Sequence, residues 1–210
     1  MFTVTAKQLG KKFQKDWIFR SLDLTLKTND SIVLLGNNGS GKSTLLQVLI
    51  GSITPSKGNI EYHNSKPIAQ EHWYRHVSIA APYLDIYQEL TIAECIDTQR
   101  QFKPFINNLS TSEIIELLEL KHATKKHISA YSSGMRQRLK LGLAILAQTP
   151  VLALDEPTMN LDKKAIDWFQ EILTHFKNER IIITCSNEQT AEYTHANKQL
   201  NLLDYKAKRT

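Results

Sequence analysis

Apolar side chains recur along the chain with two different spacings, and each spacing predicts a different kind of element. In the first thirty residues Leu22, Leu24 and Leu26 alternate with polar residues. A period of two is typical of half-buried antiparallel strands. Runs dominated by apolar residues predict strands that are buried on both faces. These runs lie at 31–35, 151–154 and 180–184.

The spacing becomes helical in the middle of the chain. A helix is predicted over 91–102, and Pro104 is expected to separate it from a second helix over 110–120. Ser110 and Glu113 have the spacing of a capping box, which marks the start of the second helix. The other predicted elements are strands at 58–63 and 76–80 and helices at 132–148 and 162–176.

This order of elements predicts the fold class. Strands and helices that alternate, with strands apolar throughout, imply an α/β fold in which a mostly parallel sheet is flanked by helices. The first strands are expected to form an antiparallel β subdomain at the N-terminus. The helical stretch at about 91–129 interrupts the alternation and is expected to be an inserted α-helical subdomain. No repeat or second-domain boundary is visible, so residues 1–210 are predicted to form one domain.

Composition excludes several classes of protein. Hydrophobic residues make up 41% of the 210 residues and charged residues 22%, as in globular proteins. No apolar run approaches the roughly 20 residues of a membrane-spanning helix, and the N-terminus lacks the apolar core of a signal peptide. Two cysteines, Cys95 and Cys185, are too few and too far apart for a disulfide framework or a zinc site. A reducing, cytoplasmic location is expected.

The net charge changes this picture little. Twenty-six basic and 21 acidic side chains give +5, a mildly basic balance. The basic residues come in short clusters such as Lys121, Lys125 and Lys126, without the interleaved aromatic side chains of a nucleic-acid stacking surface. Solvated faces are the better interpretation, and no nucleic-acid partner is expected.

The strongest chemical signal is the stretch GNNGSGKST at 36–44, which fits the pattern G-x-x-x-x-G-K-[ST]. Its glycines allow a tight loop whose backbone N–H groups turn toward phosphate oxygens. Lys42 is expected to reach the β- and γ-phosphates, and the Ser43 hydroxyl to bind Mg²⁺. The start of the following helix carries a partial positive charge that faces the same anion. The predicted nucleotide-binding residues are Gly36, Asn37, Asn38, Gly39, Ser40, Gly41, Lys42, Ser43 and Thr44.

Two carboxylates follow the apolar run at 151–154. Asp155 ends a buried parallel strand, where such sheets place their ligand groups, and is predicted to hold Mg²⁺. Glu156 is predicted to polarise the attacking water. The alternative is that these residues form an acidic cap on the next helix.

A second anion site is indicated at Tyr131 to Leu146. Ser132 and Gly134 lie where this helix is expected to begin, so a hydroxyl, backbone N–H groups and a positive helix end come together. Taken alone, this segment is best interpreted as an amphipathic helix with a serine cap. A chain with one phosphate loop needs a second such site only if it serves the nucleotide of a neighbouring molecule.

Together these motifs resemble the ATP-binding cassette family, specifically the nucleotide-binding subunit of a transporter. Residues 36–44 resemble its Walker A motif, 151–157 its Walker B motif and YSSGM at 131–135 a variant of its signature motif. Phe13 falls where the family places an aromatic side chain against adenine. The resemblance runs from about residue 2 to 204. Asn160, Leu161 and Asp162 resemble its D-loop.

The resemblance implies a RecA-like P-loop NTPase that binds ATP and Mg²⁺, with Lys42 and Glu156 catalytic and Ser43 and Asp155 on the metal. Two ATP-binding subunits, identical or different, would pair head to tail, with Ser132, Ser133 and Gly134 contacting the partner's ATP. Closure on ATP would drive a separate membrane-spanning subunit, and the chain would sit on the inner face of the membrane. Alternatives are a nucleotide-gated module with little hydrolysis and a soluble ATPase outside transport.

Two positions depart from the family's pattern. Its metal-touching glutamine is missing near Ala81–Pro82, since Gln88 comes six residues too late. Its switch histidine is also missing, and Cys185 or Ser186 occupies that position. Slower turnover than in a standard subunit is therefore expected, or pairing with a non-identical cassette. Ser133 and Met135 replace the Gly and Gln of the usual signature.

Overall fold

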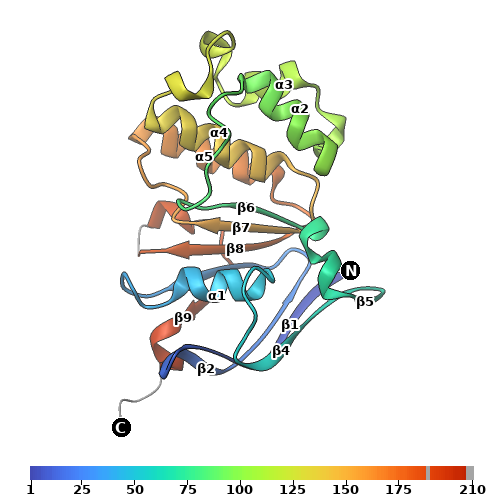
Figure 1. Cartoon of the computed structure of the whole chain (residues 1–210), viewed down its shortest axis with the longest axis vertical. Coiled ribbons are helices and arrows are strands. Elements are labelled where there is room, and N and C mark those ends of the chain that lie inside the picture. Colours follow the sequence, from blue (N-terminus) through green and yellow to red (C-terminus); the bar gives the residue numbers. More distant parts are fainter. Residues whose placement is uncertain (188–189, 207–210) are drawn as a thin grey trace.

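A computed structural model describes residues 1–187 and 190–206 and contains two sheets with helices on either side (Figure 1). The strands are β1 (Phe2–Phe13), β2 (Asp16–Lys27), β3 (Ser31–Leu35), β4 (Lys57–Asn64), β5 (Lys66–Ile68), β6 (Val77–Ala80), β7 (Val151–Asp155), β8 (Ile181–Ser186) and β9 (Lys198–Asn201). The α-helices are α1 (Lys42–Leu49), α2 (Ile92–Phe102), α3 (Thr111–Leu117), α4 (Ser133–Leu146) and α5 (Lys163–Phe176). No helix among these residues is both long and apolar enough to cross a membrane.

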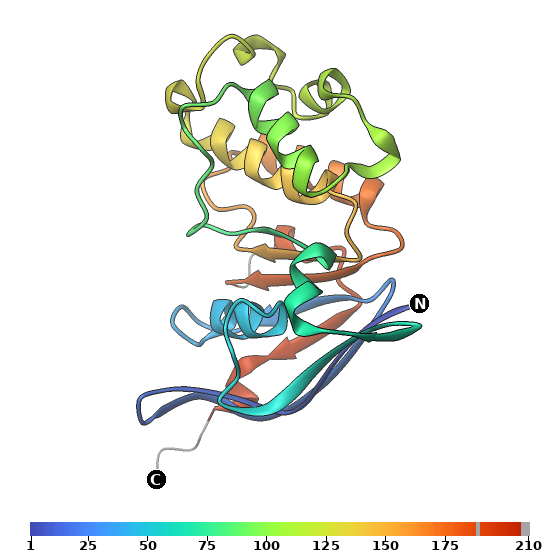
Figure 2. The same ribbon diagram turned by 45° about the vertical axis from the view of Figure 1, so that its right-hand side comes forward.

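The central sheet is parallel, in the order β6-β7-β8-β3-β9. Every residue of β7 and β8 is buried, which explains why these strands are mostly apolar. Helices α4 and α5 cover one face of this sheet, and α1 lies on the other face (Figures 1 and 2). The carboxyl ends of parallel strands meet at one edge, so residues that follow β3, β7 and β8 are brought together there.

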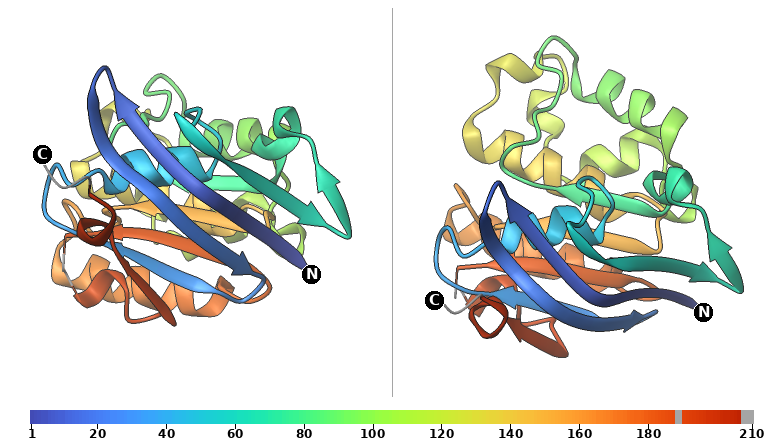
Figure 3. Two further views of the ribbon diagram at one scale, coloured as in Figure 1. Left: turned by 90° about the horizontal axis from the view of Figure 1, so that it is seen from below. Right: turned by 60° about the horizontal axis from the view of Figure 1, so that its bottom comes forward.

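The second sheet is antiparallel, in the order β2-β1-β4-β5. Seen from below, β1, β2 and β4 cross in front of α1, so this helix lies between the two sheets (Figure 3). Its apolar residues share one core with both: Leu45 and Leu49 of α1 belong to the same cluster as Phe19 and Leu22 of β2. This is the predicted N-terminal β subdomain, and the α/β fold class is confirmed.

Local sequence signals were correct for most elements. The predicted capping box is present, since Ser110 Oγ accepts from the Glu113 backbone N–H and the Glu113 side chain accepts from the Ser110 N–H. The helix predicted to reach Gln148 is shorter, because α4 ends at Leu146. The three-residue edge strand β5 was missed.

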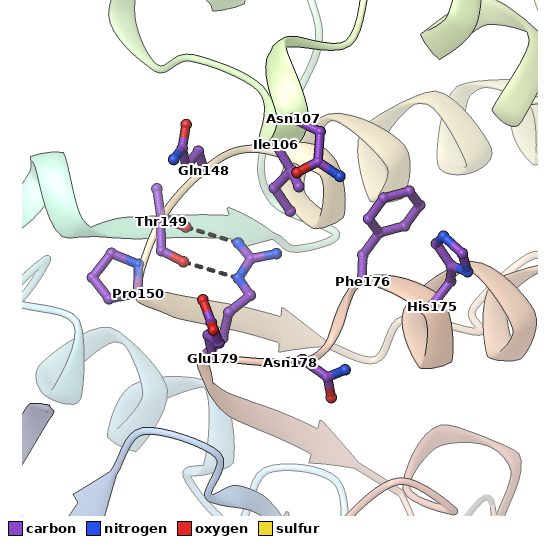
Figure 4. A pocket seen from close by; sticks show the side chains of 10 residues that line it. Ile106, Asn107, Gln148, Thr149, Pro150, His175, Phe176, Asn178 and Glu179 are labelled. Carbon is purple, nitrogen blue, oxygen red and sulfur yellow. Dashed lines mark hydrogen bonds between the residues drawn. The ribbon is translucent and has the colours of Figure 1, made fainter.

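Arg180 explains where α4 ends. This side chain is only 4% exposed, and its guanidinium donates to the carbonyl oxygens of Ile145 (2.5 Å), Ala147 (2.8 Å) and Thr149 (2.9 Å). It therefore satisfies carbonyl groups that a helix end leaves without partners. Arg180 lines a pocket of about 430 Å³. Figure 4 shows Thr149, Pro150 and Phe176 in the wall of this pocket. Burial lowers the pKa of Arg180 to about 10.

Replacing Arg180 with methionine is expected to lower the free energy of unfolding by about 3 kcal/mol, because the buried carbonyl groups lose their donors. Chemical denaturation of the purified chain measures this change. Arg20→Met, at an exposed position of β2, is the matched control and should change stability by less than about 0.5 kcal/mol. Equal stabilities of the two variants would show that the buried guanidinium contributes nothing.

Candidate functional site

The loop between β3 and α1 is shaped by its glycines. Gly41 begins the helix with a φ of 104°, and a Cβ at this position would lie 2.1 Å from Ile18 Cγ2. Only glycine fits both the backbone and the close approach of β2. No side chain among the described residues caps α1. The N–H groups of its first turn are therefore left for a ligand, as an anion site at a helix start requires.

Lys42 is folded back over this loop. It is 4% exposed, and its Nζ donates to Gly36 O at 2.7 Å, Asn37 O at 3.2 Å and Asn187 Oδ1 at 2.6 Å. An ammonium group has three hydrogens, and all three have an acceptor here. The positive charge is thus held inside the loop, where the phosphates were predicted to bind.

Asp155, at the end of β7, faces the start of α1. It is 2% exposed and hydrogen-bonds with the Ser43 side chain, while its Oδ1 is buried with no partner among the described residues. Burial raises the pKa of the Asp155 carboxyl, and the hydrogen bond from Ser43 opposes this shift. A buried carboxylate oxygen without a partner beside a hydroxyl suits a hard cation such as Mg²⁺.

Few protein side chains are available to hold such a metal ion. Within residues 1–187 and 190–206, no group of three or more His, Cys, Asp or Glu side chains converges as a metal cage. This fits Mg²⁺, which takes one or two protein oxygens and fills its remaining positions with substrate phosphates and water. Ser43 and Asp155 are the residues that would hold it.

Asp155→Asn is expected to stabilise the nucleotide-free chain while it weakens Mg²⁺-dependent nucleotide binding. A carboxyl whose pKa is raised by folding is most favourable to stability when protonated, and that contribution is lost as pH rises through the folded-state pKa. At neutral pH the ionised Asp155 therefore costs stability, and asparagine removes the cost. Thermal melts without nucleotide from pH 4 to 8 should show a gain of a few degrees for the variant at pH 7 that shrinks toward pH 4. A lower melting temperature for the variant at pH 7 would contradict this.

Glu156 lies just beyond the strand in an unusual conformation. Its φ is 47°, a left-handed value that costs energy for any residue other than glycine and is common at functional sites. Its N–H donates to Cys185 O (3.1 Å), and its Oε1 accepts from Asn187 Nδ2 (2.6 Å). The alternative of an acidic helix cap is wrong, because α5 begins at Lys163 and its cap is Asp162, which accepts from the Ala165 N–H.

The predicted signature and D-loop residues form a separate surface. Ser132 caps α4 by accepting from the Met135 N–H at 3.2 Å, and a Cβ on Gly134 would lie 3.7 Å from Asn160 O. Ser132, Gly134, Asn160 and Asp162 line one hollow of about 690 Å³. Helix α4 and the phosphate-loop helix α1 lie on opposite faces of the parallel sheet (Figure 1). One chain therefore does not bring its own signature residues to its own phosphate loop.

Comparison with known proteins decides the family. The family model described as "ABC transporter" matches residues 19–159, which include the phosphate loop, Asp155 and Glu156. The chain belongs to the ABC transporter family. Members of this family bind and hydrolyse ATP, so the family, fold class and ATPase activity predicted from the sequence are confirmed.

Several relatives support the assignment to this ABC family. The chain is 30% identical to the cytochrome c biogenesis ATP-binding export protein CcmA of Rhizobium johnstonii, covering 88% of each protein. It is 31% identical to the bacitracin transport ATP-binding protein BcrA of Bacillus licheniformis, covering 77% of this chain and 53% of that one. A putative ABC transporter ATP-binding protein of Pyrococcus furiosus has the same fold, with a TM-score of 0.81, 21% identity and coverage of 98% and 100%.

Phe13, the residue predicted to stack on adenine, has an accessible ring. Phe13 ends β1, is 48% exposed and has Lys11 Nζ 5.0 Å from its ring centroid. An exposed aromatic face is suited to stacking on a base, although stacking by Phe13 stays a prediction.

Cys185 or Ser186 was predicted at the position of the missing switch histidine, and the structure brings a third residue of this segment into the site. Cys185 and Ser186 are both fully buried within β8, whereas Asn187, the next residue, contacts Lys42 and Glu156 directly. Sequence reasoning missed Asn187. The available signal was its place as the first residue after a buried strand at the ligand edge of the sheet.

Tyr83 is the other side chain that sequence reasoning missed. It follows Ala81–Pro82, where the family's glutamine is absent, and it hydrogen-bonds with Gln47 of α1. Burial and the nearby carboxylate of Asp155 raise the pKa of the Tyr83 phenol. Gln88 instead lines a hollow with Ser133 and Asn160. The phenol of Tyr83, and not Gln88, therefore borders the metal side of the site.

Proposed function

We propose that this chain hydrolyses ATP with Mg²⁺ as one of two ABC subunits paired head to tail, and that the pair drives a membrane-spanning subunit. The chain would then lie on the inner face of the membrane. The second ATP-binding subunit is either another copy of this chain or a related cassette. Its closure on ATP and opening after hydrolysis would supply the movement that the membrane subunit uses.

One observation gives this proposal its main support. Lys42, Ser43, Asp155 and Glu156 meet at one edge of the parallel sheet. Ser132 and Gly134 lie at the start of α4, and this helix covers the opposite face of the sheet from α1. A signature that cannot serve its own nucleotide needs the nucleotide of a partner. Rotation of one chain relative to a second would place each exposed serine cap over the other chain's phosphate loop.

The residues divide the chemistry of hydrolysis among them. The N–H groups at the start of α1 and the charge of Lys42 bind the phosphates and hold the γ-phosphate in line with an attacking water. Glu156 accepts a proton from that water as its oxygen bonds to phosphorus and the bond to ADP breaks. Mg²⁺, held by Ser43 and Asp155, would neutralise charge on the phosphate oxygens. The serine and helix end from the partner would add hydrogen bonds to the same phosphate.

The names of relatives support a transport role. The rhizobial relative is named as an export protein and the Bacillus relative as a transport protein. A search for the partner tests this role directly: the tagged chain is recovered from mildly solubilised native membranes with ATP present. A polytopic membrane protein at a fixed ratio to the chain is the expected result. Recovery only with ribosomes or nucleic acid would favour a soluble ATPase outside transport.

A further inference from the structure

Asn187 joins the two residues on which hydrolysis depends. Its Oδ1 accepts from Lys42 Nζ and its Nδ2 donates to Glu156 Oε1, each at 2.6 Å. The two partners carry opposite charges and come from α1 and from the end of β7, 145 and 31 residues away in the sequence. Both hydrogen bonds involve an ionised group, which makes them stronger than bonds between neutral groups.

A side-chain amide suits this position. It offers one acceptor for the cation and one donor for the carboxylate, whereas a carboxylate has no donor and an ammonium no acceptor. The bridge is partly buried, so water competes less for these bonds than it would at the surface. The amide of Asn187 therefore gives each of its two charged partners a hydrogen bond of the required polarity.

The bridge competes with the nucleotide. Lys42 uses its three hydrogens on Gly36 O, Asn37 O and Asn187 Oδ1. A terminal phosphate that binds Lys42 must replace one of these acceptors. The first two are backbone atoms of the phosphate loop, so the side chain of Asn187 is the one that can turn away at little cost. Once it turns, its Nδ2 can donate to a phosphate oxygen.

We propose that Asn187 is the residue that recognises the γ-phosphate and positions Glu156 accordingly. Without nucleotide it holds Lys42 and Glu156 in the bridge. With ATP, the γ-phosphate takes over Lys42, and the Asn187 amide donates to this phosphate, which releases Glu156 toward the attacking water. Asn187 is thus a positioning residue, and this role rests on the proposed ATP site.

The test compares the affinities of the whole chain for ATP and ADP in wild type, Asn187→Ala and Asn187→Asp. Displacement of a fluorescent ADP analogue measures both. The ratio of ATP to ADP affinity should fall about tenfold in Asn187→Ala, because only ATP loses a hydrogen bond to a charged oxygen. It should fall further in Asn187→Asp, where a carboxylate of the same shape repels the γ-phosphate. ATP hydrolysis should fall in both variants.

Asn59→Ala is the matched control, since Asn59 Nδ2 also donates to a glutamate, Glu61, at 2.9 Å on the exposed strand β4. Its affinity ratio should equal that of the wild type. Circular dichroism establishes that each variant is folded. Ratios within twofold of wild type in both Asn187 variants would overturn the inference. If Lys42→Ala also leaves ATP binding unchanged, the proposed ATP site itself is wrong, and not only the role of Asn187.

Discussion

Glu156→Gln is expected to lower ATP hydrolysis by at least about 100-fold, because a general base contributes that much or more to such reactions. The amide has nearly the same shape as the carboxylate but cannot accept the proton of the attacking water. Binding should survive, since Lys42 and the start of α1 are unchanged. The variant should therefore accumulate as an ATP-bound pair of chains. Phosphate release and the size of the complex with ATP measure the two effects.

Glu171→Gln, on an exposed face of α5, controls for the loss of one negative charge and should hydrolyse ATP at the wild-type rate. Equal turnover in Glu156→Gln and wild type would exclude Glu156 as the base. Negligible turnover in wild type, with no further loss in the variant, would instead support a nucleotide-gated module with little hydrolysis.

Lys42→Ala is expected to weaken ATP binding by about 100-fold. The substitution removes a buried positive charge from the phosphate site, and hydrogen bonds between charged groups are worth about 1.5–3 kcal/mol each. It also removes the donor for Gly36 O and Asn37 O, so the empty loop loses its internal order. Titration of the purified chain with a fluorescent ATP analogue measures the affinity.

Lys15→Ala is the control for this substitution, because Lys15 is an exposed lysine in the β1–β2 turn. It should bind ATP as the wild type does. An unchanged affinity in Lys42→Ala would mean that the loop does not hold the phosphates, and the assignment of Ser43 and Asp155 to the metal would lose its basis.

The parts of the site that were predictable from the sequence are contiguous segments. The phosphate loop is one run of nine residues, and the constraint at Gly41 is visible in its spacing. The carboxylates at 155 and 156 follow an apolar run, so the strand that carries them was identifiable. The cap of α4 at Ser132 was also predictable from the sequence, because the start of a helix depends on residues that are close along the chain.

The parts that were not predictable depend on contacts between distant segments. The hydrogen bond from Lys42 to Asn187 spans 145 residues, and the place of Asn187 directly after a buried strand does not identify Lys42 as its partner. Arg180 ends α4 from 35 residues away, so the helix pattern alone overestimated its length. Tyr83 resembles an ordinary exposed tyrosine in the sequence, and only the packing of its loop against α1 brings the phenol near Asp155.

Mixing two inactive variants tests most directly whether each ATP site is shared between two chains. Lys42→Ala disables the phosphate loop. Gly134→Val fills the signature hollow, and its own chain should tolerate the change because the nearest atom to a Cβ there is 3.7 Å away. Each variant alone should be inactive. An equal mixture should recover about one quarter of the wild-type rate, because half of the pairs are mixed and each mixed pair has one intact site of two. No recovery in the mixture would contradict head-to-tail pairing of two copies of this chain.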